Sequence, residues 1–261
     1  SLCQWLPVEL FGITRAGRCG KTSLFRILTT LLLADGGLGF GLRSGCGEGL
    51  QSHPQAVGYM PGRFSLYPDL TVEENLNFFA TVFHTTIEEN YDLVRDIYRQ
   101  IEPFRKRRAG ALSGGMKQKL ALSCALIHKP DVLFLDEPTV GLDPLIRRKL
   151  WGLIKRIQQE GTTILLTTHY IEEAEFLADR VIFLDKGRIV AEGTPNALMN
   201  RIGQWALDVQ CNGLLTTRYF NERDEAARET TQEQGTSTVR RVNLEDVFLS
   251  ITGRKVSGSA Q

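Results

Sequence analysis

The sequence predicts an α/β fold in which short buried strands alternate with helices around a mainly parallel sheet. Short, mostly apolar runs are typical of strands buried on both faces, and three of them are Val132–Leu135, Thr163–Leu166 and Val181–Leu184. Between the first two runs, apolar residues recur at helical spacing from Leu145 to Ile157. Strand, helix and strand in this order favour parallel pairing, because parallel strands need a crossover connection.

The composition is that of an ordinary globular protein. The chain has 261 residues, of which 42% are hydrophobic and 23% charged, and these values exclude wholesale disorder. A formal net charge of +1 gives no general attraction to nucleic acid, so we expect no nucleic-acid partner. The longest strongly apolar stretch, Leu24–Ala34, is too short to cross a bilayer, and no signal peptide is visible. The five cysteines lack metal-binding spacing, which indicates reduced thiols in a cytoplasmic protein.

The first predicted elements have the layout of a phosphate-binding loop. A mostly apolar strand, Val8–Ile13, precedes a glycine-bearing loop that ends in Lys21 and Thr22, and a helix-like run, Leu24–Leu33, follows. In such a loop the backbone N–H groups at the helix start hold phosphates, the lysine adds charge and the threonine offers a hydroxyl to Mg²⁺. The full pattern needs a glycine where Arg15 stands, so the alternative of a plain helix start remains open.

Two capping boxes predict a helical segment at residues 71–101. Thr71–Glu74 and Thr86–Glu89 have the spacing at which a threonine and a glutamate satisfy each other's free backbone N–H groups. We expect the first box to open a helix over Asn75–Phe83 and the second a helix over Asn90–Ile101.

A serine and two glycines open the next predicted helix. The run Leu112–Gln118 leads into the helix-like segment Leu120–Ile127. Free N–H groups and a hydroxyl at the positive end of a helix dipole favour an anion. An ordinary serine cap is the alternative.

Two adjacent carboxylates end the strand that begins at Val132. Asp136 could hold Mg²⁺ and Glu137 could polarise an attacking water, although solvated charges at a strand terminus are the alternative. The segment Gly141–Pro144 follows and by itself indicates a turn. His169 comes directly after another predicted strand, a position where a lone histidine is more often structural than catalytic.

The last third of the chain begins with a hairpin and ends in a small tail. Asp185–Gly187 is a turn signal between Val181–Leu184 and Arg188–Ala191, and Thr194-Pro195 fits a helix start. Beyond residue 200, the polar stretch Asn221–Thr238 predicts a solvated linker before a final segment.

The order of these motifs resembles the ATP-binding cassette of ABC transporters. In that family the corresponding motifs are the Walker A loop with Lys21-Thr22, the signature Leu112–Gln118, the Walker B end Asp136-Glu137, the D-loop Gly141–Pro144 and the switch histidine, His169. Residues 57–200 match throughout. Asn243–Arg254 near the C-terminus resembles the tail of single-cassette exporters of drugs, lipids or polysaccharides.

The resemblance implies a P-loop NTPase fold with a defined division of the chain. Residues 1–200 would form the ATPase cassette, with a helical, signature-bearing subdomain at about residues 68–110. Residues 201–261 would form a small C-terminal tail, and residues 1–56 are atypical for the family.

The resemblance also implies roles for individual residues. Glu137 and His169 would be catalytic, and Thr22 and Asp136 would hold Mg²⁺. Two cassettes would face each other head to tail, and the ATP contacts would come from Gly17, Gly20, Lys21, Thr22, Ser23, Ser113, Gly114, Gly115 and Asp143.

The implied function is that of an ATP-binding and ATP-hydrolysing subunit, with ATP and Mg²⁺ as cofactors, that powers a membrane exporter. It would act as a homodimer with membrane-spanning permease subunits encoded elsewhere, peripherally bound at the cytoplasmic face of the cell membrane. Leu66–Leu70 lies where the family docks a helix of the membrane subunit, or else forms a turn with a buried Tyr67.

Departures from the family pattern cluster in residues 1–62. Arg15 replaces a Walker A glycine, and Gly62 stands where the family usually has a glutamine. The segment Gly36–Gly49, with seven glycines in fourteen residues, replaces a hairpin. These departures leave open a degenerate cassette, truncated or chimeric, that does not hydrolyse ATP and acts only as a binding or regulatory module.

Overall fold

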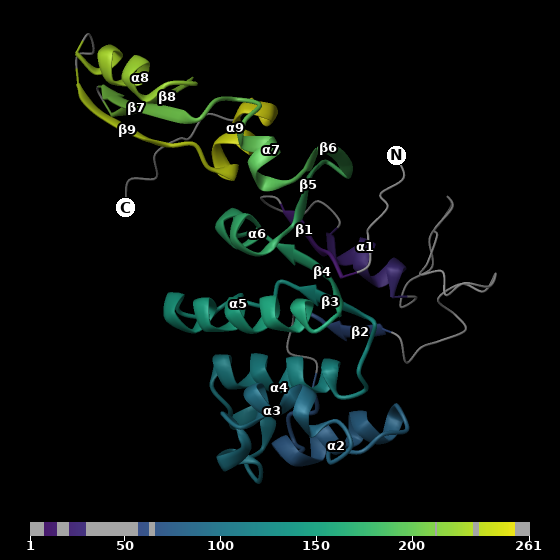
Figure 1. Ribbon diagram of the computed structural model, residues 1–261. Coiled ribbons are helices and arrows are strands. Elements are labelled where there is room, and N and C mark those ends of the chain that lie inside the picture. Colours follow the sequence, from purple (N-terminus) through teal and green to yellow (C-terminus); the bar gives the residue numbers. More distant parts are fainter. Residues whose placement is uncertain are drawn as a thin grey trace, which may run out of the picture. The chain divides into compact units, whose positions relative to one another are not determined.

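The structure, a computed structural model, describes residues 8–14, 21–29, 57–62, 66–211, 213–231 and 235–253 (Figure 1). These residues form two compact units. The first contains the described residues up to Phe11 and from Lys21 to Thr168, and the second contains Gly12–Thr14 and the described residues from His169 onward. The predicted division between cassette and tail near residue 200 remains a prediction.

The first unit is built on a parallel sheet. Its strand order is β2 (Val57–Met60), β3 (Val132–Asp136), β4 (Thr163–Thr168) and the first two residues of β1 (Leu10–Thr14). β2, β3 and β4 pair in parallel, and the pairing of β3 with β4 is the one that the sequence predicts. Every residue of β3 and β4 is buried, which accounts for their continuous apolar runs.

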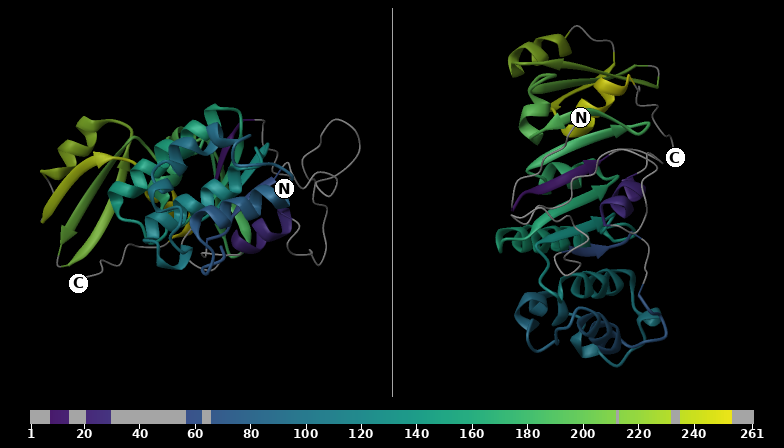
Figure 2. Two further views of the ribbon diagram at one scale, coloured as in Figure 1. Left: turned by 90° about the horizontal axis from the view of Figure 1, so that it is seen from below. Right: turned by 90° about the vertical axis from the view of Figure 1, so that its right-hand side faces the viewer.

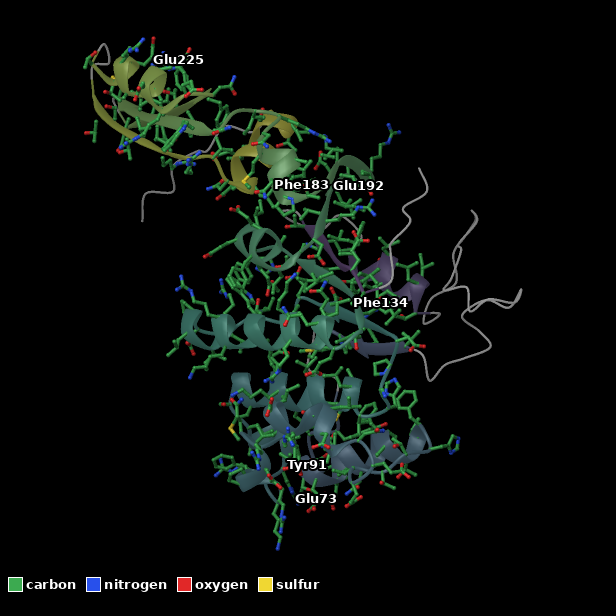
Figure 3. The ribbon with its side chains drawn as sticks, in the orientation of Figure 1. Glu73, Tyr91, Phe134, Phe183, Glu192 and Glu225 are labelled. Atoms are coloured by element: carbon green, nitrogen blue, oxygen red, sulfur yellow. The ribbon has the colours of Figure 1, made fainter. Side chains whose placement is uncertain are left out.

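Helices cover this sheet and hold its core. In α1 (Lys21–Leu28), Phe25 packs edge-on against Phe134 of β3, with ring centroids 5.2 Å apart; Phe134 is labelled in Figure 3. α5 (Pro144–Gln159) follows β3 and buries its apolar stripe, in agreement with the predicted helix.

A group of helices forms the other part of the first unit and is coloured blue to teal in Figures 1 and 2. Its elements are α2 (Val72–Val82), α3 (Tyr91–Tyr98), the 3-10 helices η3 (Glu102–Phe104) and η4 (Ala109–Ala111), and α4 (Gly114–Leu126). Both α2 and α3 pack on α4. The capping box predicted at Thr71–Glu74 is confirmed at the start of α2.

The second predicted capping box forms its hydrogen bonds but does not open the helix. Thr86 and Glu89 bond each other's backbone N–H groups at 3.1 and 3.2 Å, yet they close a turn, and α3 begins only at Tyr91. Asn90 precedes the helix without capping it, because its side-chain amide donates instead to the hydroxyl of Thr85 and to the carbonyl of Ile127, each at 2.8 Å.

The second unit begins with α6 (Ile171–Leu177) and the predicted hairpin. β5 (Arg180–Asp185) and β6 (Arg188–Gly193) pair antiparallel. Their turn residues Lys186 and Gly187 have φ of 49° and 77°, the left-handed conformations that a tight hairpin turn requires. α7 (Pro195–Met199) starts as predicted, capped by Thr194.

The predicted solvated linker at Asn221–Thr238 is wrong. The chain there contains α8 (Arg223–Thr230) and the start of β9 (Thr236–Arg241), and β9 completes a three-stranded antiparallel sheet of order β8-β7-β9. The other two strands are β7 (Trp205–Cys211) and β8 (Leu214–Phe220). The sequence misleads because α8 has only one buried residue, Ala226, and no residue of β9 is fully buried.

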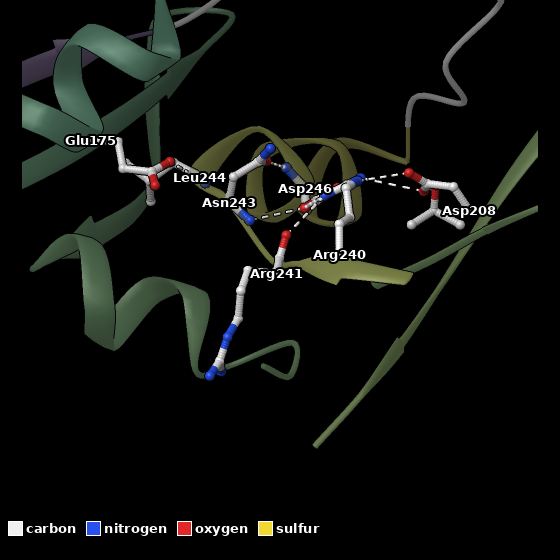
Figure 4. A network of polar contacts seen from close by, with 8 residues as sticks. Glu175, Asp208, Arg240, Arg241, Asn243, Leu244 and Asp246 are labelled. Atoms are coloured by element: carbon white, nitrogen blue, oxygen red, sulfur yellow. Dashed lines mark hydrogen bonds and ion pairs between the residues drawn. The ribbon is translucent and has the colours of Figure 1, made fainter. Parts of the chain in front are cut away.

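The final helix, α9 (Leu244–Thr252), is joined to this sheet by a polar network (Figure 4). Arg240 of β9 donates from Nε to Asp208 and from Nη1 to Asp246, each at 2.7 Å. Asp246 also accepts from the backbone N–H of Asn243 in a capping box, and the Leu244 N–H donates to Glu175 of α6. Within the described ranges, no helix combines the length and the apolar character needed to span a membrane.

Candidate functional site

The carboxyl end of β3 places two carboxylates beside β4. Asp136 is 2% exposed, and its Oδ1 atom accepts a hydrogen bond from the Thr167 hydroxyl at 2.5 Å. The parallel register sets Asp136 opposite Thr167, which explains this contact. A carboxylate this deeply buried needs such a donor, because an unpaired buried charge is very costly.

Glu137 has an unusual backbone conformation. Its φ of 55° lies in the left-handed region, which costs a non-glycine residue about 1–3 kcal/mol and tends to occur at functional sites. Its N–H donates to the carbonyl of Thr167 at 2.9 Å, so β4 holds the turn in place. The turn directs the glutamate side chain toward the start of α1, where it meets Lys21.

Lys21, the first residue of α1, completes the cluster. Only 6% of the residue is exposed, and its Nζ atom lies 3.2 Å from Oε1 of Glu137 and donates to the carbonyl of Thr168 at 3.3 Å. The Phe25–Phe134 contact one turn further along fixes this helix on β3. Lys21, Asp136 and Glu137, hereafter the lysine–carboxylate cluster, therefore come from two segments that are distant in sequence, the start of α1 and the end of β3.

The cluster offers oxygen ligands of the kind that Mg²⁺ prefers. Asp136 supplies a carboxylate, while the side chain of Thr22, next to Lys21, is exposed and carries a hydroxyl. Ser23 is likewise exposed. The predicted Gly17 and Gly20, like Arg15 and Gly36–Gly49, lie outside the described residues.

Gly62 lies against the same strand end. A Cβ atom at this position would come within 2.8 Å of the Asp136 carbonyl oxygen, closer than real Cβ contacts allow. The glutamine expected here from the family pattern would therefore require a backbone shift. The structure thus gives a steric reason for the glycine.

The signature segment forms a helix start, as expected. Ser113 caps α4 by accepting a weak hydrogen bond from the Met116 N–H at 3.4 Å, and Ser113 and Gly114 are exposed. A Cβ atom on Gly115 would lie 3.3 Å from two side-chain atoms of Ile146, so the glycine permits close packing of α4 on α5.

Asp143 has a clear structural role. Its Oδ1 atom accepts from the N–H groups of Leu145 and Ile146, both at 3.0 Å, and so caps α5. That Asp143 also contributes to the ATP contacts between two facing cassettes stays a prediction. His169, in the second unit, is exposed. Its ring lies against that of Tyr170, with the ring centroids 4.1 Å apart.

Three residues near the cluster were missed in the sequence. The Thr167 hydroxyl donates to Asp136, and the Thr168 carbonyl accepts from Lys21. Only the register of β3 with β4 could have indicated these two contacts. Tyr59 lies opposite Phe134 on β2, and burial, together with the charge of Asp136, raises the pKa of its hydroxyl.

Comparison with known proteins identifies relatives over nearly the whole chain. The family model described as ABC transporter matches residues 9–140. The Nod factor export ATP-binding protein I of Burkholderia lata is 36% identical over 275 residues, covering 95% of this chain and 89% of the relative. The probable multidrug ABC transporter ATP-binding protein YbhF of Escherichia coli is 39% identical over 199 residues, covering 73% of this chain and 33% of YbhF.

A solved structure agrees with these relatives. The dimeric structure of MJ0796, a bacterial ABC transporter cassette, superposes with a TM-score of 0.63 at 25% identity, covering 74% of this chain and 88% of that one. The matched regions contain the lysine–carboxylate cluster, since the family model spans residues 9–140.

Proposed function

Because this chain belongs to the ABC transporter family, as one of its ATP-binding, ATP-hydrolysing subunits, we propose that the lysine–carboxylate cluster is its hydrolytic centre. The observation that carries this proposal is the contact of Lys21 with Glu137 at the end of β3. This contact places a cation that can bind phosphate next to a carboxylate that can activate a water molecule.

Each member of the cluster has a chemical role in this proposal. Lys21 binds the terminal phosphates of ATP, and Glu137 orients the attacking water and accepts its proton as general base. Thr22 and Asp136 hold Mg²⁺, which when bound neutralises charge on the phosphate oxygens. Thr167 keeps the Asp136 carboxylate in position through its hydroxyl.

A second copy of the chain completes the site. Ser113, Gly114 and Gly115 present a helix start to the phosphates held by the other copy. The remaining predicted contacts come from Gly17, Gly20, Ser23, Asp143 and His169, with His169 contacting the γ-phosphate. The solved cassette that the chain resembles is itself dimeric, which supports pairing of two copies.

The partner of the dimer is a membrane-spanning permease at the cytoplasmic face of the membrane. An exposed apolar patch on the helical part of the first unit supports this docking. Tyr67, Phe78 and Val82 are 47%, 40% and 51% exposed. The rings of Tyr67 and Phe78 are in edge-on contact, with their centroids 4.9 Å apart. Tyr67 is thus not the buried turn residue that was the alternative. Relatives named for Nod factor export and multidrug transport favour an exporter.

The comparisons give no support to a degenerate cassette. The family match includes residues 9–62, where the departures cluster, and the alignment with the Nod factor protein leaves only a small part of the chain unmatched. Lys21 and Glu137 form an ion pair, and Asp136, the residue before Glu137, is bonded to Thr167 of the adjacent strand.

Binding of ATP by the purified chain tests this proposal. A fluorescent ATP analogue should bind in the presence of Mg²⁺, and Lys21→Ala should weaken that binding at least tenfold. Lys155→Ala, on α5, is the matched control and should bind as the unmodified chain does. Binding that is indifferent to Lys21 would overturn the assignment of the cluster.

A further inference from the structure

A groove lies in the first unit, between α3, α4 and α5. This α3–α5 groove has a volume of about 340 Å³. One face of α5 lines it with residues at helical spacing, namely Lys149, Gly152, Leu153 and Arg156. Lys119 of α4 and Asp96 of α3 also line it. None of these residues belongs to the lysine–carboxylate cluster.

Positive charge dominates the groove. Among the described residues that line it, Asp96 has the one carboxylate. This carboxylate is already paired, since Nη1 of Arg156 lies 2.6 Å from its Oδ2 atom. Lys119 and Lys149 add two ammonium groups, and within the described residues neither is paired with a carboxylate. Burial and the nearby charge of Lys149 lower the pKa of Lys119, so the two cations are close enough to repel each other.

The glycine on this face of α5 has no structural explanation. Gly152 lies in the middle of a sixteen-residue helix, where glycine costs roughly 0.5–1 kcal/mol relative to alanine. Apart from the adjacent backbone of α5 itself, a Cβ atom at this position would meet no atom of the described residues within 4 Å. Neither backbone conformation nor packing therefore requires glycine here, and its effect is to widen the groove beside Lys149.

We propose that the α3–α5 groove binds a phosphate-bearing small molecule, with Lys119 and Lys149 as its cationic contacts. A bound anion relieves the repulsion between the two ammonium groups. The volume falls within the range of small-molecule sites and exceeds that of phosphate alone, and Leu153 offers an apolar wall for the rest of the ligand.

This site goes beyond the proposed function, because it shares no residue with the ATP contacts. It joins two helices whose starts belong to the predicted nucleotide site: Lys119 is on the helix capped by Ser113, and Lys149 is on the helix capped by Asp143. The ligand therefore bridges α4 and α5.

Inorganic phosphate is the probe for the test. The full chain carrying Lys21→Ala, which removes the principal phosphate contact of the ATP site, is dialysed to equilibrium against radiolabelled phosphate. We expect saturable binding at one site with a Kd in the roughly millimolar range, as suits two charge-assisted contacts to a small ion. Lys119→Met and Lys149→Met should each weaken this binding at least tenfold.

Three further variants keep the test independent of folding. Lys149→Arg retains the charge and should retain binding, and Lys155→Met, on the same helix but outside the groove, should leave it unchanged. Asp96→Asn removes the negative charge and should tighten binding severalfold. Absence of saturable binding, or equal binding by the Lys119→Met, Lys149→Met and Lys155→Met proteins, would overturn the proposal.

Discussion

The Nζ atom of Lys21 lies 3.2 Å from Oε1 of Glu137, so the first residue of α1 and the residue after β3 form an ion pair. Both side chains are largely shielded from solvent, with exposed fractions of 7% and 20%. An anionic phosphate at this position would compete with the glutamate for the same ammonium group.

Replacement of Glu137 by glutamine should separate hydrolysis from binding. We expect Glu137→Gln to lower ATP turnover by roughly 10²–10³-fold, because the amide cannot accept a proton from the attacking water. ATP affinity should be kept or increased, because the competing negative charge is gone. Phosphate release and nucleotide titration measure the two effects. Glu160→Gln, at the end of α5, should change neither, and loss of ATP binding in Glu137→Gln would contradict this account.

Gly62 should tolerate no side chain. Because a Cβ atom would lie 2.8 Å from the Asp136 carbonyl, Gly62→Ala should lower the free energy of unfolding by roughly 1–3 kcal/mol and reduce turnover. Urea denaturation and the ATPase rate measure both. Gly152→Ala is the matched control: its Cβ would enter open space, and the variant should be as stable as the unmodified chain or more so. Equal stability of Gly62→Ala and Gly152→Ala would show that the strand end can move aside.

The sequence predicted the first unit better than the second for a physical reason. A strand buried on both faces, such as β3, is largely apolar. The run Val132–Leu135 could therefore be recognised as a strand from the sequence alone. β9 reads Thr-Ser-Thr-Val-Arg-Arg and alternates between exposed and half-buried residues over its first four positions, so its polar start, Thr236–Thr238, was assigned to a linker. The backbone pairing that holds it in the sheet is with β7, which is distant in sequence.

The functional side chains were predictable, but their contacts were not. Lys21, Asp136 and Glu137 follow from local motifs. The donors and acceptors that hold them, Thr167 and Thr168, follow from a strand register that no local pattern contains.

Loss of Arg240 should destabilise the C-terminal sheet. Its guanidinium bridges Asp208 and Asp246, and Asp246 is only 3% exposed, so Arg240→Ala leaves a buried carboxylate with fewer donors. We expect the free energy of unfolding to fall by about 1–3 kcal/mol. Backbone hydrogen exchange in residues 235–253 should be faster in Arg240→Ala than in the unmodified chain. Arg218→Ala removes an exposed pair with Glu229 and should cost less than about 1 kcal/mol. Equal effects of the two substitutions would show that the bridge adds nothing beyond a surface pair.

His128 is held as a neutral ring between the helical part of the first unit and β2. Its ring stacks on Phe83 with centroids 3.8 Å apart, and its Nε2 atom lies 3.0 Å from the Val57 carbonyl. That contact needs a proton on Nε2, since the carbonyl oxygen can only accept. The other ring nitrogen, Nδ1, is buried and has no hydrogen-bond partner among the residues that the structure describes. Burial lowers the pKa of His128 below its usual value of 6.5.

Acidification should therefore destabilise the protein through His128. As the pH falls below about 6.5, the unfolded chain takes up a proton at this ring before the folded chain does, so stability is complete above this pH and declines toward the lower, folded pKa. The free energy of unfolding should decrease between about pH 7.5 and about pH 5.5, and this decrease should be smaller for His128→Gln than for the unmodified chain. His84→Asn, at an exposed position whose φ of 57° asparagine tolerates, should leave the dependence unchanged. Parallel pH profiles for His128→Gln and the unmodified chain would contradict a role for His128, because the other titrating groups are common to both proteins.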